Sequence, residues 1–224
     1  MGNFEERLRL ASLLEKTFIE AFNKYFGDRF IIVKYGIETT ELHAFHNYLR
    51  TCHDITSHFV RYIPDSVLIE TKRDENHRLC PTRLIEFKAA KTGLYSPKFF
   101  EKLKGACPSV PLERKEDVFN IEKDALDLYK ALEEKLNIPV VIIAYAAYRS
   151  DTRLFAQYSS EIGICNEYNP NKRGKNRGSG TVLYNVSLKT FQPLKLFLKE
   201  DLLFSDDEIE RFLAELEARL SGEL

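Results

Sequence analysis

Apolar residues recur at helical spacing at both ends of the chain. Between residues 4 and 26 they return every three or four positions and Gly27 follows, which predicts a helix. Near the other end, the segment S-D-D-E at Ser205–Glu208 is a capping box, and it predicts a last helix over residues 205–221. The apolar stripe of this helix can close the core or contact a second copy of the chain, so the pattern leaves a homodimer open.

Shorter apolar runs between these helices predict strands at residues 28–35, 65–71, 83–90, 140–147, 153–164 and 181–187. The run V-V-I-I-A-Y-A-A is continuously apolar, as expected for a strand that is buried on both faces. A helix predicted over residues 118–136 precedes this run and implies a right-handed crossover to a parallel neighbour. Two more helices are predicted at about 38–58 and at 97–104. The pattern therefore predicts an α/β fold.

The composition fits a single domain over residues 1–224, with a core at about 4–164, a basic hairpin loop at 165–187 and the C-terminal helix. Hydrophobic residues make up 44% of the chain, charged residues 30%, and the net charge is −1, so any binding to DNA must depend on local basic clusters. The start of the chain is acidic and no apolar run approaches the length of a membrane span. We therefore expect a cytoplasmic protein with no membrane partner, and four reduced cysteines, since no C-x-x-C occurs.

The stretch from Ile63 to Gly93 carries the strongest candidate chemistry. Glu86 and Lys88 are two residues apart on an apolar strand and so share one face of it. A symmetric hairpin would place Asp65, at the start of the preceding strand, opposite Lys88, and Val67 opposite Glu86.

Two carboxylates and one ammonium would then converge at one end of a buried sheet. Carboxylates at this separation raise each other's pKa unless a cation lies between them. Mg²⁺ binds oxygen ligands and typically uses one or two protein carboxylates together with water and phosphate. The lysine can orient or deprotonate a water molecule or neutralise a phosphate. A purely structural ion pair in a hairpin is the alternative interpretation.

The residues Pro64-Asp65 and Glu86-Phe87-Lys88 resemble the motif of the PD-(D/E)XK nuclease superfamily, and the order of elements from about residue 4 to 148 is similar as well. The resemblance implies a restriction-endonuclease-like core, a central mixed sheet flanked by helices, with residues 38–58 as an extra helix insertion. It also implies Mg²⁺-dependent hydrolysis of DNA, in which Mn²⁺ substitutes for Mg²⁺. Asp65, Glu86 and Lys88 would be catalytic, with Asp65 and Glu86 binding the metal.

In many members of the superfamily a glutamate on the first helix also reaches the metal. Glu15 is the matching candidate here, and an ion pair of Glu15 with a nearby lysine or arginine is the alternative.

A second Glu-x-Lys segment, Glu70-Thr71-Lys72, is rejected as the catalytic motif. It lies next to charged residues at the end of the first strand and only five positions after Asp65. The two halves of a motif on one strand cannot face each other across a ladder.

Basic residues near the motif and in a glycine-rich loop are candidate contacts for the DNA backbone. The candidates are Lys91, Lys98, Lys172, Arg173, Lys175 and Arg177. A solvated lysine face and a disordered hairpin tip are the alternatives. We expect a restriction-type DNA endonuclease. A junction-resolving or repair nuclease, a non-catalytic nucleic-acid-binding protein on the same fold, and an interaction protein with a structural Asp-Glu-Lys trio remain alternatives.

Overall fold

The structure, a computed structural model, describes residues 3–34, 62–76, 78–90, 96–106, 112–147, 151–168 and 182–222. Its helices are α1 (Asn3–Phe26), α4 (Pro97–Lys104), α5 (Lys123–Leu136), α6 (Leu194–Glu200) and α7 (Asp206–Gly222). Its strands are β1 (Phe30–Lys34), β2 (Ser66–Glu70), β3 (Cys80–Ala90), β4 (Val118–Glu122), β5 (Val140–Ala146), β6 (Leu154–Tyr158), β7 (Ile164–Tyr168), β8 (Leu183–Ser187) and β9 (Gln192–Pro193). The predicted α/β class is confirmed.

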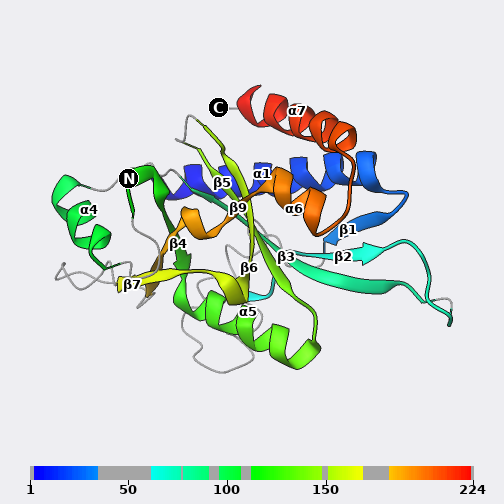
Figure 1. Cartoon of the computed structure of the whole chain (residues 1–224), viewed down its shortest axis with the longest axis horizontal. Helices are drawn as coiled ribbons and strands as arrows, with labels where there is room; N and C mark the ends of the chain where they lie inside the picture. Colours follow the sequence, from blue (N-terminus) through cyan, green and yellow to red (C-terminus); the bar gives the residue numbers. More distant parts are fainter. Residues whose placement is uncertain are drawn as a thin grey trace.

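A mixed six-stranded sheet in the order β1-β2-β3-β5-β6-β9 forms the centre of the molecule. Only β3 and β5 pair in parallel, and the other neighbours are antiparallel. Helices α1, α6 and α7 cover one face of this sheet, and α5 covers the other (Figure 1). Parallel strands require a crossover connection, and α5 lies in the connection between the parallel strands β3 and β5. The expected parallel neighbour of the 140–147 strand is thus confirmed as β3.

The two faces of the sheet have separate apolar cores. Side chains of β3 alternate between them, so Ile85 and Phe87 pack under α1, whereas Leu84 packs under α5. Strand β5 is buried along its whole length, as its unbroken apolar sequence predicts. Glu86 and Lys88 point toward the face covered by α5, since they have the parity of Leu84.

Aromatic rings and a polar network join α7 to the start of the chain. Phe212 of α7 packs against Phe18 and Phe26 of α1 at ring-centroid distances of 5.3 and 5.2 Å. The predicted capping box is present: the Glu208 N–H donates to Ser205 Oγ at 3.4 Å, and the Ser205 N–H donates to Glu208 Oε2 at 2.8 Å.

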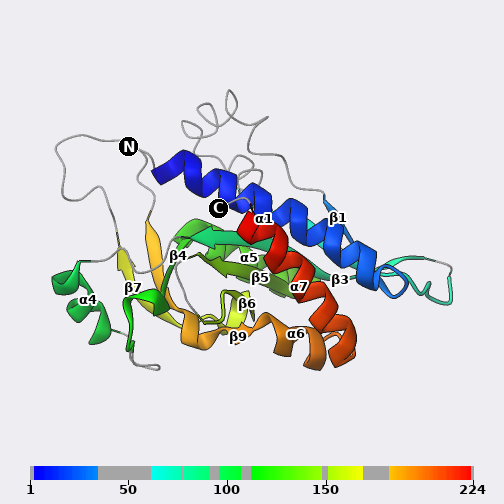
Figure 2. The same cartoon turned by 90° about the horizontal axis from the view of Figure 1, so that it is seen from above.

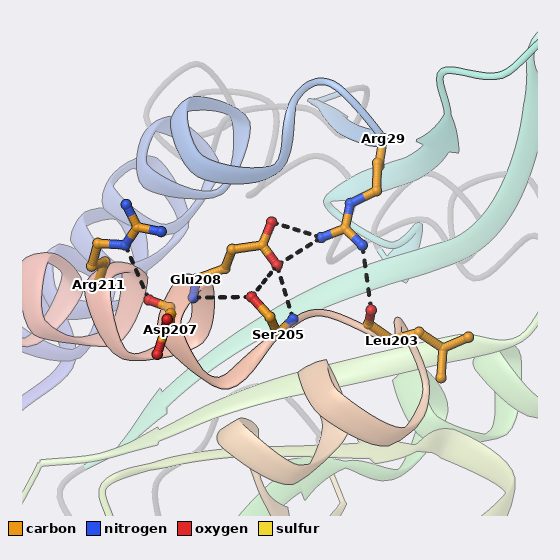
Figure 3. A network of polar contacts seen from close by, with 6 residues as sticks. All are labelled: Arg29, Leu203, Ser205, Asp207, Glu208 and Arg211. Atoms are coloured by element: carbon orange, nitrogen blue, oxygen red, sulfur yellow. Dashed lines mark hydrogen bonds and ion pairs between the residues drawn. The ribbon is translucent and has the colours of Figure 1, made fainter.

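Arg29 binds the same cap from the loop before β1 (Figure 3). Its guanidinium donates to both carboxylate oxygens of Glu208, at 3.0 and 3.1 Å, and to the carbonyl of Leu203 at 3.3 Å. The capping box therefore begins α7 and also attaches this helix to the edge of the sheet.

A second, three-stranded sheet in the order β4-β8-β7 lies at one end of the molecule together with α4, while the β2–β3 turn lies at the other end (Figures 1 and 2). Phe99 of α4 contacts Tyr168 of β7 at a ring-centroid distance of 5.4 Å. Phe119 and Ile121 of β4 join the core beneath α5, so the two sheets share that core.

Several boundaries differ from the sequence predictions. The helix expected at 118–136 begins only at Lys123, because residues 118–122 form β4 and pair with β8. The strand expected at 153–164 ends at Tyr158, and the chain makes a short 3-10 turn before β7. The sequence pattern did not predict β7, β9 or α6. The helix expected at 38–58 lies outside the described residues.

The cysteines also differ from expectation. Cys165 is disulfide-bonded, so the expectation of four reduced thiols is wrong for this residue. Cys80 is a free thiol. In the part of the chain that the structure describes, every helix is too short or too polar to cross a lipid bilayer.

Candidate active site

The β2–β3 hairpin brings Asp65 and Glu86 together. The ladder pairs Ser66 with Ile85, and extending it by one residue places Asp65 opposite Glu86. The expected pairing of Asp65 with Lys88 is therefore wrong by two residues. The structural reason is an asymmetric turn, which sets Glu70 opposite Cys80; the register shift between residues 68 and 69 then brings the pairing one residue closer to the expected register.

Hydrogen bonds hold the three candidate side chains at the same end of the hairpin. Asp65 Oδ2 accepts a hydrogen bond of 2.9 Å from the N–H of Phe87, which follows Glu86 in β3. Lys88 Nζ donates to Glu86 Oε1. The Glu86 side chain is 6% exposed and that of Lys88 is 30% exposed, so the cluster is buried at its base and reachable from solvent at Lys88.

The second carboxylate oxygen of Glu86 has no donor in the part of the chain that the structure describes. Glu86 Oε2 is buried and lacks a hydrogen-bond partner among the described residues. A buried acceptor without a donor carries a desolvation cost of about 1–3 kcal/mol or more when charged. The hairpin therefore maintains a negative oxygen that only an added positive or donor group would satisfy.

Burial and neighbouring negative charge perturb the titration of Asp65. Burial raises the pKa of the Asp65 carboxyl well above its usual value, and the charge of Glu86 raises it further. Lys88 and the Phe87 N–H lower it only in part. The positive charge of one lysine therefore does not compensate for two carboxylates, as expected for a site that accepts an additional cation.

Lys88 remains a cation. Burial lowers the pKa of Lys88, but attraction to Glu86 and Asp65 and the hydrogen bond to Glu86 outweigh burial and raise the pKa above its usual value. A lysine in this state can neutralise a phosphate or donate a hydrogen bond to water. It is a poor general base, so of the two roles expected for the lysine the geometry favours orientation of water over its deprotonation.

Two residues near this cluster were not among the site residues predicted from the sequence. Tyr129 of α5 is 1% exposed, and burial together with the charges of Glu86 and Asp65 raises the pKa of its phenol. Glu122, at the junction of β4 and α5, makes a smaller contribution to the raised pKa values of Tyr129 and Lys88. A tyrosine in an apolar helical stripe was the available sequence signal for Tyr129. Glu122 gave none, because its segment was predicted to be helical.

Glu15 forms an ion pair instead of lying free as a third carboxylate for the metal. Its Oε1 lies 2.9 Å from Lys34 Nζ at the end of β1, so the alternative of an ion pair is present in the structure. Glu15 is nevertheless near enough to Asp65 to contribute, as the smallest of five causes, to the perturbed pKa of that carboxyl. It borders the cluster and is already paired with a cation.

The basic candidates are largely outside this geometry. Lys98 is exposed on the first turn of α4, at the end of the molecule that carries the second sheet. Lys91, Lys172, Arg173, Lys175 and Arg177 lie outside the described residues. The structure therefore brings together Asp65, Glu86 and Lys88, with Glu15 at the border.

The donor set fits Mg²⁺ only in the sparse form that this ion commonly takes. Across the described ranges, no group of three or more His, Cys, Asp and Glu side chains is placed to hold a metal. Asp65 and Glu86 supply two carboxylates, and Mg²⁺ typically takes one or two of these and fills its remaining positions with water and substrate phosphate. The partnerless Glu86 Oε2 is consistent with such a site.

Comparison of the sequence with models of protein families and with curated proteins gave no match. The arguments from the residues and the geometry therefore carry the functional assignment.

Proposed function

We propose that this chain is a metal-dependent endonuclease that hydrolyses phosphodiester bonds in DNA, in the manner of a restriction enzyme. The observation that carries the proposal is Glu86 Oε2, a buried carboxylate oxygen with no donor among the described residues, beside Asp65 and Lys88. A structural ion pair would satisfy its own acceptors, whereas a cation site keeps one available.

The arrangement of elements supports a restriction-endonuclease-like core, which is part of the same proposal. Helix α1, strands β1 to β3, helix α5 and strand β5 follow one another in the order that the resemblance implies, with β4 and α4 inserted before α5. Asp65 precedes β2, and Glu86 and Lys88 lie on β3 next to its parallel neighbour β5.

In the proposed reaction Asp65 and Glu86 hold a divalent cation. When bound, that ion supplies Lewis-acid chemistry: it acidifies water and offsets the charge on the scissile phosphate. Lys88 contributes a fixed positive charge and hydrogen-bond donors, which orient the attacking water and stabilise the phosphate oxygens as charge builds up. The water forms a new P–O bond in line with the P–O bond that breaks, and the leaving oxygen takes up a proton.

The test is cleavage of supercoiled plasmid by the full chain in Mg²⁺ or Mn²⁺, with EDTA as the control. We expect nicked and linear DNA in either metal and none in EDTA. Salt-sensitive binding of DNA without cleavage would instead identify a non-catalytic DNA-binding protein. Absence of both activities on plasmid and on branched DNA would contradict the proposal and leave the ion pair as a structural feature.

A further inference from the structure

The tip of the β2–β3 hairpin projects beyond the rest of the central sheet. Strand β1 accompanies β2 only as far as Glu70, and β5 pairs with β3 only from Leu84 onward. Residues 72–76 and 78–79 therefore extend past the neighbouring strands, at the end of the molecule opposite α4 (Figures 1 and 2). Within the described chain these tip residues add no side chain to an apolar core, so packing does not account for the extension.

Cations predominate on the exposed surface of this tip. Lys72, Arg73 and Arg78 are all exposed. Of the two acidic residues of the tip, Glu75 is exposed and Asp74 is half-buried. The Asp74 carboxylate is engaged within the turn, where its Oδ1 accepts hydrogen bonds from two backbone N–H groups. The tip thus presents a local positive charge on a chain whose net charge is −1, which is the kind of local cluster that binding to DNA requires here.

The hairpin also fixes how far this charge lies from the candidate active site. Arg78 is eight residues before Glu86, and Lys72 is seven residues after Asp65. At about 3.3 Å per residue, the tip therefore lies at most about 27 Å from the two carboxylates. One helical turn of DNA spans about 34–36 Å. A single duplex can therefore reach both the carboxylates and the tip within one helical turn.

We propose that the hairpin tip, through Lys72 and Arg78, contacts the phosphate backbone of the duplex that is cut at the candidate active site. This inference rests on the proposed function and adds a substrate contact remote from the sequence motif. A two-stranded ribbon is narrow enough to enter the major groove of DNA, and cations on it bind the flanking phosphates and release counterions. Phosphate contacts position a duplex and carry no sequence information. The tip therefore acts on the affinity for DNA and leaves the chemical step unchanged.

The double substitution Lys72→Ala/Arg78→Ala tests this contact. It removes two positive charges and keeps the turn, because the hydrogen bonds of Asp74 to Arg78 involve only the Arg78 backbone. The matched control is Lys195→Ala/Lys199→Ala, which removes two surface lysines from α6, on the face of the sheet away from the candidate active site. Thermal melting of both variants verifies the fold.

Two measurements are made on each full-length protein. Fluorescence anisotropy gives the Kd for a duplex of about three helical turns, in EDTA and at about 50 to 200 mM salt. Plasmid cleavage in Mg²⁺ gives kcat and KM. For the tip variant we expect a Kd that is about 10-fold or more higher, and a slope of log Kd against log salt that is smaller by about 1.8, or about 0.9 for each lost phosphate contact. KM should rise and kcat should stay the same, while the α6 control should match the wild type.

The outcomes separate this contact from the proposed function. Equal Kd values and equal salt slopes in the two variants would overturn the inference and identify the tip as a solvated turn, while the nuclease proposal stands. A lower kcat with an unchanged KM would overturn it as well. Binding that depends on the tip, without cleavage by the wild type, would support the contact and contradict the nuclease proposal. If the wild-type chain neither binds nor cuts DNA, the proposed function fails, and this contact fails with it.

Discussion

The chain contains two Glu-x-Lys segments, one at each end of the same hairpin, and they have opposite environments. Glu70-Thr71-Lys72 ends β2, where Glu70 is half-buried and Lys72 is exposed. Glu86-Phe87-Lys88 lies within β3, beside the parallel neighbour β5, and Glu86 is buried. Spacing alone is therefore uninformative, because the same three-residue pattern occurs in both.

The difference arises from what the partner strands place alongside. Glu70 pairs with Phe30 and Cys80, which bring no charge. Glu86 has Asp65 across the ladder, and the two carboxylates bring together negative charge that Lys88 only partly offsets. The comparison shows that an acidic residue becomes a candidate ligand through the residues paired with it and through exclusion of water.

The strongest contrast between the two segments concerns catalysis. We expect Glu86→Gln to lower the rate of plasmid cleavage by about 10³-fold or more, because a cation ligand is lost from the transition state. The same change at the other segment, Glu70→Gln, should leave the rate within about twofold, since Glu70 lies at the turn end of the hairpin, away from Asp65 and Lys88. Initial rates in saturating Mg²⁺ measure both. Comparable losses in the two variants would mean that the hairpin as a whole, rather than Glu86, matters.

The lysines should separate in stability as well as in rate. Lys88→Ala leaves two buried carboxylates without their cation, so we expect a loss of about 2–4 kcal/mol in the free energy of unfolding at pH 8 in EDTA. Lys72→Ala removes an exposed charge and should change it by less than about 0.5 kcal/mol. Urea denaturation measures both values. The Lys88→Ala deficit should shrink at acidic pH, where the carboxyls are protonated; a deficit that is independent of pH would contradict the electrostatic origin.

Asp65 should make the metal-free protein less stable as the pH rises. Its pKa in the folded state is raised, so the folded chain retains a proton that the unfolded chain has lost, and stability falls as the pH rises through that interval. Asp65→Asn removes this penalty and should be more stable than the wild type at pH 8, while being inactive. The exposed Glu75→Gln is the control. Parallel stability–pH curves for wild type and Asp65→Asn in EDTA would refute this prediction.

The sequence predicted the elements whose signals are local. The helical periodicity of α1, the capping box of α7 and the apolar run of β5 were each sufficient, because each reflects burial against a whole layer of the structure. The clustering of Asp65, Glu86 and Lys88 followed from the order of two adjacent strands.

Elements that depend on distant pairing were beyond this reasoning. The segment V-F-N-I-E forms β4 only because it pairs with β8, about 65 residues later, and its apolar positions also fit a helix. Likewise Tyr129 and Glu122 reach the site through the α5 crossover, so their local sequence does not show that they lie near Glu86.

The register of the hairpin was mispredicted for a different reason, the chemistry of its turn. Asp74 Oδ1 accepts hydrogen bonds from the N–H groups of Asn76 at 2.8 Å and Arg78 at 2.7 Å, and the Asp74 N–H donates to the Arg78 carbonyl. A side chain that caps its own turn fixes where the chain reverses. The register shift between Leu68 and Ile69 then changes the pairing by one residue, so that Asp65 lies opposite Glu86 instead of Ile85. A symmetric turn was therefore the wrong assumption.

This turn yields the smallest expected effect and completes the contrast between the hairpin's two ends. Asp74→Ala removes both side-chain hydrogen bonds, so we expect a loss of about 1 kcal/mol in the free energy of unfolding, as for a helix cap. Cleavage should stay within about twofold of wild type, because the β2–β3 ladder beyond the register shift still sets Asp65 against Glu86. Urea denaturation and plasmid cleavage are the two measurements. A large loss of cleavage with a small loss of stability would show that the turn itself fixes the geometry of the site, and the two ends of the hairpin would then be coupled rather than independent.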